Sequence, residues 1–194
     1  MSTKSASLVV VCSAMLLGGL VATTGSRDEL PVRSGSPVSP VSPVHHFRER
    51  VAAYTQLRQQ IIADLLENGI DPNADDGREF RNRLGLAIRE ARRRAQPGEI
   101  FSADVAGHMR RVVWNTLLGE DEILSDVPEV PSLRVNDFYP EGEPLATVPA
   151  LLLAQFEPLP PELQYRFLAN ALILLDIDTS LIVDFIPDAF QRSS

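Results

Sequence analysis

The sequence predicts an α+β fold, with a three-helix N-terminal part followed by a small C-terminal antiparallel β-meander. Two patterns support this fold class. Apolar residues between Phe47 and Leu117 recur at the spacing of helices, whereas those between Leu163 and Ile186 alternate as in strands. Helices and strands that occupy separate parts of a chain are typical of α+β proteins.

The chain divides into a signal peptide (1–25), a Pro/Ser-rich linker (26–44) and a single α+β domain (45–190). The first segment has a positive residue at Lys4, an apolar run at Leu8–Leu20 and small residues at Ala22–Ser26. This order is typical of a secretory signal. The uncharged stretch 5–24 is also just long enough to span a bilayer, so an uncleaved membrane anchor is an open alternative.

Cys12 is the one cysteine of the chain, and it lies in the middle of the apolar run. A lipoprotein would have its cysteine at the end of that run, which argues against lipidation. Removal of the leader would leave no thiol, so disulfides and cysteine metal sites are excluded for the mature protein. The linker that follows repeats Ser-Pro-Val from Ser36 to Val44, and proline at every third position favours extended polyproline II over helix.

Three helices are expected in the N-terminal part, over 46–67, 77–94 and 103–118. Asn68-Gly69 ends the first, Asp76 can cap the second, and Ser102 can cap the third. The inward positions of the three helices are Phe47, Val51, Tyr54, Ile61 and Leu65; Phe80, Leu84, Ala87, Ile88, Ala91 and Ala95; and Val105, Met109, Val112, Val113, Thr116 and Leu117.

Residues 119–148 are rich in turn formers, and Pro149 fits the first turn of a short helix that reaches Phe156. Three strands are then expected, over 163–167, 172–176 and 181–186, with turns at Ala169-Asn170 and 178–180. Strict alternation along the last strand places Phe185 in the core and Asp184 on the exposed face.

The charge is uneven along a chain whose formal net charge is -8. The segment 78–111 holds nine arginines against four acids, a net of +5, whereas 112–194 holds 14 acids against three arginines, a net of -11. Mutual neutralisation of these segments across the fold is one interpretation, and anion binding by the arginine-rich helix is the other. An acidic chain without a basic tail argues against nucleic acid as a partner.

Motifs for catalysis or metal binding are weak. The segment Asp71–Gly77 resembles a calcium loop, but its glycine comes one residue late and Asn82 stands where a glutamate is needed. His45, His46 and His108 are the three histidines, and their positions do not predict a shared metal site. Asp176, Asp178 and Asp184 lie in or beside the expected strands. Paired carboxylates there could act as acid and base, but solvated strand faces are the better interpretation. The sequence therefore assigns no catalytic, cofactor-binding or metal-ligating residue.

Four stretches together resemble an uncharacterised family of small exported bacterial proteins over about 45–190. They are Gly98-Glu99-Ile100-Phe101, Arg134-Val135-Asn136 with Tyr139-Pro140-Glu141-Gly142, 159–167 (LPPELQYRF) and 181–189 (LIVDFIPDA). The resemblance implies export and brings no known activity, cofactor or site residue. The tail alone is weakly similar to periplasmic nickel/cobalt-homeostasis proteins.

These observations favour a non-enzymatic binding or structural module of the cell envelope, in the periplasm or secreted, with no cofactor. The partner would be an envelope protein or a small ligand, and membrane contact would come only through an uncleaved N-terminal segment, which would anchor the protein to the inner membrane. The alternative is a small periplasmic hydrolase that uses carboxylates such as Asp176 and Asp184.

Overall fold

The computed structural model describes residues 42–117, 127–128, 130 and 132–190. These residues belong to one unit, which extends over 39–194. The leader, Cys12 and the linker up to Val41 lie outside the described residues. What the sequence predicts for them therefore stays a prediction.

Helix α1 extends over Pro43–Glu67, so it begins three residues before the expected start. Proline fits the first turn because its fixed φ suits a helix and its missing N–H would have no partner there. Phe47, Val51, Tyr54 and Ile61 are buried, which confirms the inward stripe of the first helix.

Helix α2 extends over Arg78–Ala91 and follows the short 3₁₀ turn η1, Ala74–Gly77. The prediction that Asp76 caps this helix is wrong. The backbone is left-handed at Asp75, Asp76 and Gly77, so Gly77 occupies the N-cap position, without a side-chain cap hydrogen bond. Helix α3 extends over Ala103–Leu117, close to the expected range.

The C-terminal part is an antiparallel sheet in the order β1-β2-β3-β4. Strands β2 (Leu163–Leu168), β3 (Ala171–Asp176) and β4 (Leu181–Ile186) form the predicted meander. Strand β1, Ala146–Thr147, was not predicted, because two residues show no alternation. Helix α5, Ala150–Leu153, is shorter than the predicted helix that reached Phe156.

The expected orientation of Asp184 and Phe185 is wrong because β4 contains a β-bulge. Leu174 lies opposite Asp184 whereas Leu175 lies opposite Ile182, which leaves Val183 as an extra residue. One extra residue reverses the alternation beyond it. Asp184 is therefore completely buried on the helix side, and Phe185 is half-buried on the other face.

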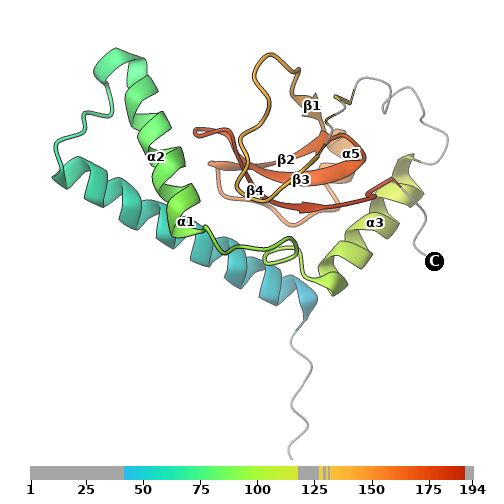
Figure 1. The fold of residues 1–194 in the computed structure, drawn as a ribbon. Coiled ribbons are helices and arrows are strands. Elements are labelled where there is room, and N and C mark those ends of the chain that lie inside the picture. Colours follow the sequence, from blue (N-terminus) through green and yellow to red (C-terminus); the bar gives the residue numbers. More distant parts are fainter. Residues whose placement is uncertain (1–41, 118–126, 129, 131, 191–194) are drawn as a thin grey trace, which may run out of the picture. The chain divides into compact units, whose positions relative to one another are not determined.

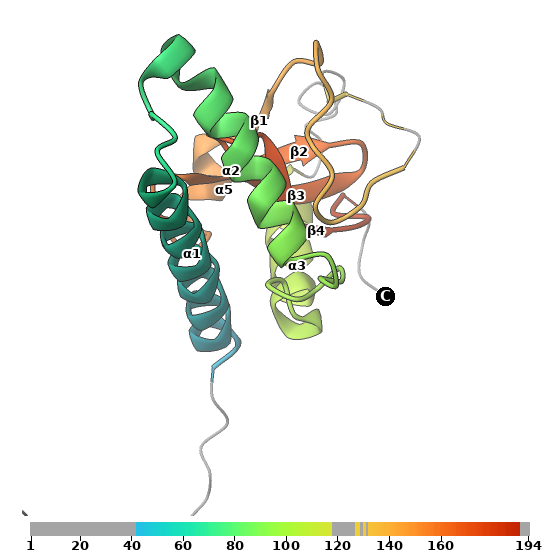
Figure 2. The same ribbon diagram turned by 60° about the vertical axis from the view of Figure 1, so that its left-hand side comes forward.

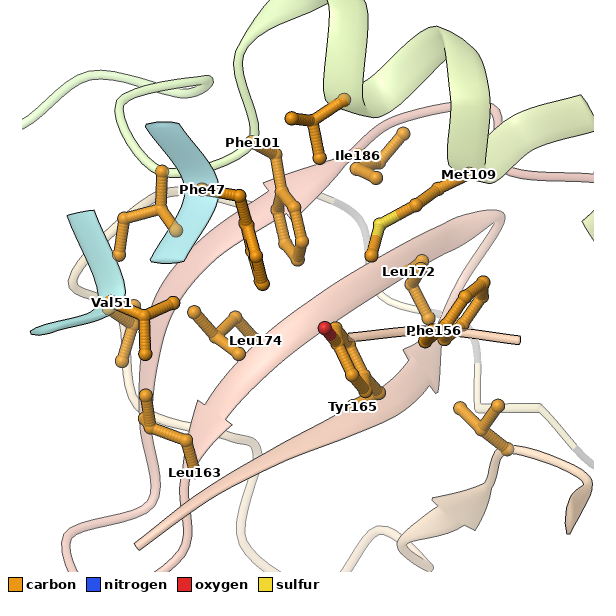
Figure 3. Packing of buried hydrophobic residues seen from close by; sticks show 14 of the residues in the cluster. Phe47, Val51, Phe101, Met109, Phe156, Leu163, Tyr165, Leu172, Leu174 and Ile186 are labelled. Carbon is orange, nitrogen blue, oxygen red and sulfur yellow. The ribbon is translucent and has the colours of Figure 1, made fainter. Parts of the chain in front are cut away.

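Helices α1, α2 and α3 cover one face of the sheet (Figures 1 and 2). That face carries Leu163, Tyr165, Phe167, Leu172 and Leu174, which pack with the inward residues of the helices (Figure 3). The other face carries Leu168, Ile173, Leu175 and Ile182, and it is covered by Tyr139, Val130 and Leu133 from the segment before β1. The same segment covers the edge of β4, where the Ile182 N–H donates to Asp137 O at 2.9 Å.

Candidate functional site

Asp176, at the end of β3, is completely buried, so the expectation that it lies on a solvated strand face is wrong, and three donors surround its carboxylate. The Tyr54 hydroxyl donates to Oδ2 at 2.7 Å, Arg58 Nε donates to Oδ2 at 2.9 Å, and the Thr179 N–H donates to Oδ1 at 3.1 Å. Arg58 also pairs with Asp178. Tyr54 and Arg58 both come from α1, so this carboxylate ties the long helix to the sheet.

Asp184 is completely buried as well, and four backbone N–H groups donate to it. Gly98 (2.9 Å) and Phe185 (2.9 Å) donate to Oδ1, whereas Ile100 (2.7 Å) and Phe101 (2.8 Å) donate to Oδ2. Backbone donors of this kind satisfy the carboxylate that burial removes from water. The side chain thereby holds the loop between α2 and α3 against β4.

The two buried carboxylates are bound by separate parts of the fold. They share no hydrogen-bond partner among the described residues, and their oxygens are occupied by separate sets of donors. Neither Asp176 nor Asp184 lines any of the five hollows described in this structure. Both residues therefore act in holding elements together.

Four arginines of the arginine-rich segment pair locally, which is not the mutual neutralisation expected between the two charged segments. Arg78, Arg83, Arg92 and Arg93 pair with Asp75, Glu79, Glu99 and Glu90, all close by in the sequence. Three acids of the C-terminal segment, Glu157, Asp176 and Asp178, pair with Arg48 and Arg58 of α1. Arg92 in addition donates to Asn136 Oδ1 and Val183 O, each at 3.0 Å, and its guanidinium lies over the Tyr54 ring.

Burial raises the pKa of all three tyrosines of the chain above the ordinary value of about 10. For Tyr54 the next cause is the negative charge of Asp176, and for Tyr165 it is that of Glu157. A hydrogen bond from the backbone of Ala146 opposes the effect at Tyr139. The tyrosines are therefore kept neutral in the folded state.

A hollow of about 470 Å³ lies between the start of α1, helix α3 and the segment 155–157. Phe47, Val105, Met109 and Phe156 form its apolar wall, and each is nearly buried. Figure 3 shows Phe47, Met109 and Phe156 as part of one cluster with Phe101 and Tyr165. The ring centroids of Phe47 and Phe101 are 5.7 Å apart, and those of Phe156 and Tyr165 are 5.1 Å apart.

Polar side chains also line this hollow: Asp104, His108, Arg111, Gln155 and Glu157. Glu157 is paired with Arg48 at 2.6 Å, and Gln155 donates to the Thr116 hydroxyl at 3.1 Å. An apolar hollow with a few converging polar groups is the usual form of a small-ligand site. We therefore treat it as the candidate functional site.

Gly107 leaves part of this hollow open. A Cβ at Gly107 would meet only Arg111 Nη1, at 3.7 Å, and Gly107 has no positive φ. By contrast, a Cβ at Gly85 of α2 would lie 2.9 Å from the Phe138 ring. Glycine inside a helix costs about 1 kcal/mol relative to alanine. Close packing against Phe138 explains the glycine at Gly85, whereas neither packing nor backbone geometry requires a glycine at Gly107.

The sequence pattern predicts core positions for Phe47 and Met109 and places Phe156 at the end of a short helix, and it does not predict a site residue at Gly107. The hollow was missed because its walls come from segments far apart in the chain. The one local signal is a glycine, Gly107, within the apolar pattern of the third helix. A glycine there lowers the stability of the helix, and such a residue usually has a packing or functional role.

The structure gives no support to a metal site in the part of the chain that it describes. No group of three or more potential metal-ligating side chains comes together among the described residues. His45 lies 3.7 Å from Glu49 on α1, whereas His108 is exposed on α3. In the calcium-like segment, Asp71 Oδ1 accepts a hydrogen bond from the Asn73 N–H, which is the geometry of a turn.

Within the described ranges, none of the helices combines the length and apolarity needed for a bilayer crossing. The candidate anchor 5–24 lies outside those ranges. Comparison with protein-family models, curated proteins and solved structures finds no match to this chain.

Proposed function

We propose that this protein is an exported, non-enzymatic binding module of the cell envelope, and that the hollow between α1 and α3 holds its ligand. The observation that carries the proposal is the 470 Å³ hollow, with an apolar wall and polar side chains at the same opening. Such a site suits a small molecule with an apolar body. The unexplained helical glycine at Gly107 adds support, because a larger side chain there would fill the space.

The alternative of a carboxylate hydrolase has less support. A general acid and base must reach a bound substrate. Asp176 and Asp184 are each surrounded by donors from the protein and line none of the described hollows. The binding role therefore agrees better with the contacts that these side chains make.

The binding proposal is tested with a fluorescent apolar probe, 1-anilinonaphthalene-8-sulfonate, on the folded protein. We expect saturable binding to the wild type and loss of that binding in Gly107→Leu, whose side chain would occupy the hollow. Ala63→Leu is the matched control, because Ala63 is exposed on α1 and does not line the hollow. Equal binding by wild type and Gly107→Leu would place the ligand elsewhere and overturn the proposal.

The export proposal depends on the leader-like pattern of Met1–Ser26, and the resemblance to small exported proteins agrees with it. A fusion of residues 1–26 to alkaline phosphatase should be active, because that enzyme requires an oxidising compartment. Inactive fusions would exclude export by this segment. Mass spectrometry of the native N-terminus then distinguishes a cleaved signal from an anchor.

A further inference from the structure

Four residues of α3 face the candidate site at helical spacing. Asp104, Gly107, His108 and Arg111 all line the hollow between α1 and α3. Residues three, four and seven positions apart lie on the same face of a helix. Asp104 and Arg111 therefore lie at the two ends of one stripe, with Gly107 and His108 between them.

Asp104 and Arg111 carry opposite charges without a counter-ion. Both are exposed, and the side chain of neither forms a hydrogen bond or an ion pair with any residue that the structure describes. Glu157, which also lines the hollow, is by contrast paired with Arg48 at 2.6 Å. The hollow therefore offers a ligand both an accessible carboxylate and an accessible guanidinium.

The guanidinium of Arg111 extends back along α3 over the opening at Gly107. A Cβ at Gly107 would lie 3.7 Å from Arg111 Nη1. Side chains of a helix lean toward its N-terminus, which accounts for this direction. The charges of Asp104 and Arg111 are thus separated by between one and two helical turns, or about 5–10 Å. A ligand that bridges them would cross the space that the glycine leaves open.

We propose that the hollow binds a zwitterion, a short molecule with an ammonium group at one end, a carboxylate at the other and an apolar body. This inference rests on the proposed function and names the chemistry of its ligand. The ammonium would pair with Asp104 and the carboxylate with Arg111, while the apolar body would lie against the apolar wall. A ligand with a single charge would place that charge near a like charge of the stripe.

Two kinds of molecule present this chemistry. An extended dipeptide of apolar residues spans about 7 Å, within the separation of the two charges. A straight-chain ω-amino acid such as 6-aminohexanoate has a similar length. The dipeptide carries its apolar surface on side chains and the ω-amino acid carries it on the chain itself, so direct comparison of the two identifies the source.

The test compares each zwitterion with analogues that lack one charge, by isothermal titration calorimetry on the full mature chain. The probes are the dipeptide Leu-Phe and 6-aminohexanoate, each also as its amide and as its N-acetyl derivative. Either modification should weaken binding by about two- to fivefold, the range expected for an exposed ion pair. Equal binding of a zwitterion and its two modified forms, or no binding of either zwitterion, would overturn the proposal.

Variants of the stripe should change the selectivity for one end of the ligand at a time. In Arg111→Met the amide should bind as tightly as the acid, whereas the acetylated form should stay weaker. In Asp104→Asn the acetylated form should bind as tightly as the free amine, whereas the amide should stay weaker. Arg50→Met and Asp64→Asn, exposed on α1 and outside the hollow, are the matched controls and should keep both preferences.

Selectivity for end groups is the readout because a structural role would not change it. Asp104 lies in the first turn of α3, where an acid stabilises the helix in any case. A lower unfolding midpoint in Asp104→Asn together with unchanged selectivity would show that Asp104 is structural and overturn the proposal. Selectivity for the carboxylate that persists in Arg111→Met would also overturn it.

Gly107→Leu separates a failure of this inference from a failure of the proposed function. If the fluorescent probe binds the wild type but not Gly107→Leu, while the zwitterions show no preference over their modified forms, the zwitterion is excluded and the binding module remains. If Gly107→Leu binds the fluorescent probe and the zwitterions as tightly as the wild type does, the hollow is not the site and both proposals fail.

Discussion

Asp184 is the residue whose role differs most from its expected one. Its two oxygens accept four backbone hydrogen bonds, three of them from the loop that leads into α3. In Asp184→Asn, an NH₂ group replaces one carboxylate oxygen, so its hydrogens face backbone N–H groups that are also donors. We expect a loss of about 2–4 kcal/mol in the free energy of unfolding, because buried donors lose their acceptor. Urea unfolding followed by Trp114 fluorescence measures it.

Phe185→Ala provides the comparison at the neighbouring position. Phe185 is half-buried on the face covered by Val130 and Leu133, so its removal should cost about 1–3 kcal/mol, less than the loss of a fully buried ring. Asp184→Asn should lower the free energy of unfolding by at least as much as Phe185→Ala does. A change within about 0.5 kcal/mol for Asp184→Asn, as at an exposed site, would contradict the bulged register.

The three tyrosines predict how stability depends on alkaline pH. Burial raises the pKa of Tyr54, Tyr139 and Tyr165 in the folded state, whereas the unfolded chain titrates near pH 10. The unfolded state therefore loses protons that the folded state keeps. The stabilisation that the three tyrosines contribute to the folded state is fully present below about pH 10 and is lost as the pH rises above it.

Near-ultraviolet absorbance of tyrosinate and circular dichroism, recorded on the same alkaline titration, check this prediction. Tyrosinate should appear together with the loss of secondary structure and not before it. In Tyr165→Phe, which removes one of the three groups, the alkaline transition should be shallower. Ionisation of two or three tyrosines near pH 10 with an intact circular dichroism spectrum would show that they are accessible.

Helices α2 and α3 each contain one interior glycine, and the two should respond differently to alanine. At Gly107 the new Cβ has free space, so Gly107→Ala should raise the free energy of unfolding by about 0.5–1 kcal/mol. At Gly85 the Cβ would lie 2.9 Å from Phe138 Cε1 and 3.2 Å from Thr179 Cβ. The propensity gain is then offset by displacement of Phe138, which Arg89 also contacts. Thermal unfolding of both variants tests these two expectations. A stabilised Gly85→Ala would contradict the close packing of Gly85 against Phe138.

The elements that sequence periodicity predicted are those with several turns or several alternations. The apolar pattern repeats often enough to be recognised in two helices and two strands. These are the stripes Phe47–Ile61 and Leu84–Ile88 and the strands that begin near Leu163 and Leu172, and their buried apolar residues contribute to the core. The bulge at Val183 was not predictable, since it depends on how β3 and β4 pair. The candidate site was not predictable either, because Phe47, Met109 and Phe156 meet only in the folded chain.

On the scale of the whole molecule, polar contacts join the helices to the sheet and to the segments that flank its strands, at points far apart in the sequence. Arg48 of α1 reaches Glu157, Tyr54 and Arg58 reach Asp176, and Arg110 of α3 donates to Pro187 O at 3.0 Å. The apolar core is likewise shared, since residues from α1, α2, α3 and β2–β4 belong to one cluster. The apolar face of the meander is removed from water by the residues of these helices.

The helices and the sheet should therefore unfold in a single transition. Trp114, the one tryptophan, lies on α3 and reports on the helical part, whereas the tyrosine signal recorded in a Tyr54→Phe, Tyr139→Phe background comes from Tyr165 and reports on β2. In that background the two denaturant midpoints should coincide. Asp176→Asn weakens a contact between α1 and β3. It should lower both midpoints by the same amount, because the helices and the sheet share one core and unfold together. If this substitution moved the tyrosine midpoint and left the tryptophan midpoint in place, the sheet and the helices would be separate cooperative units.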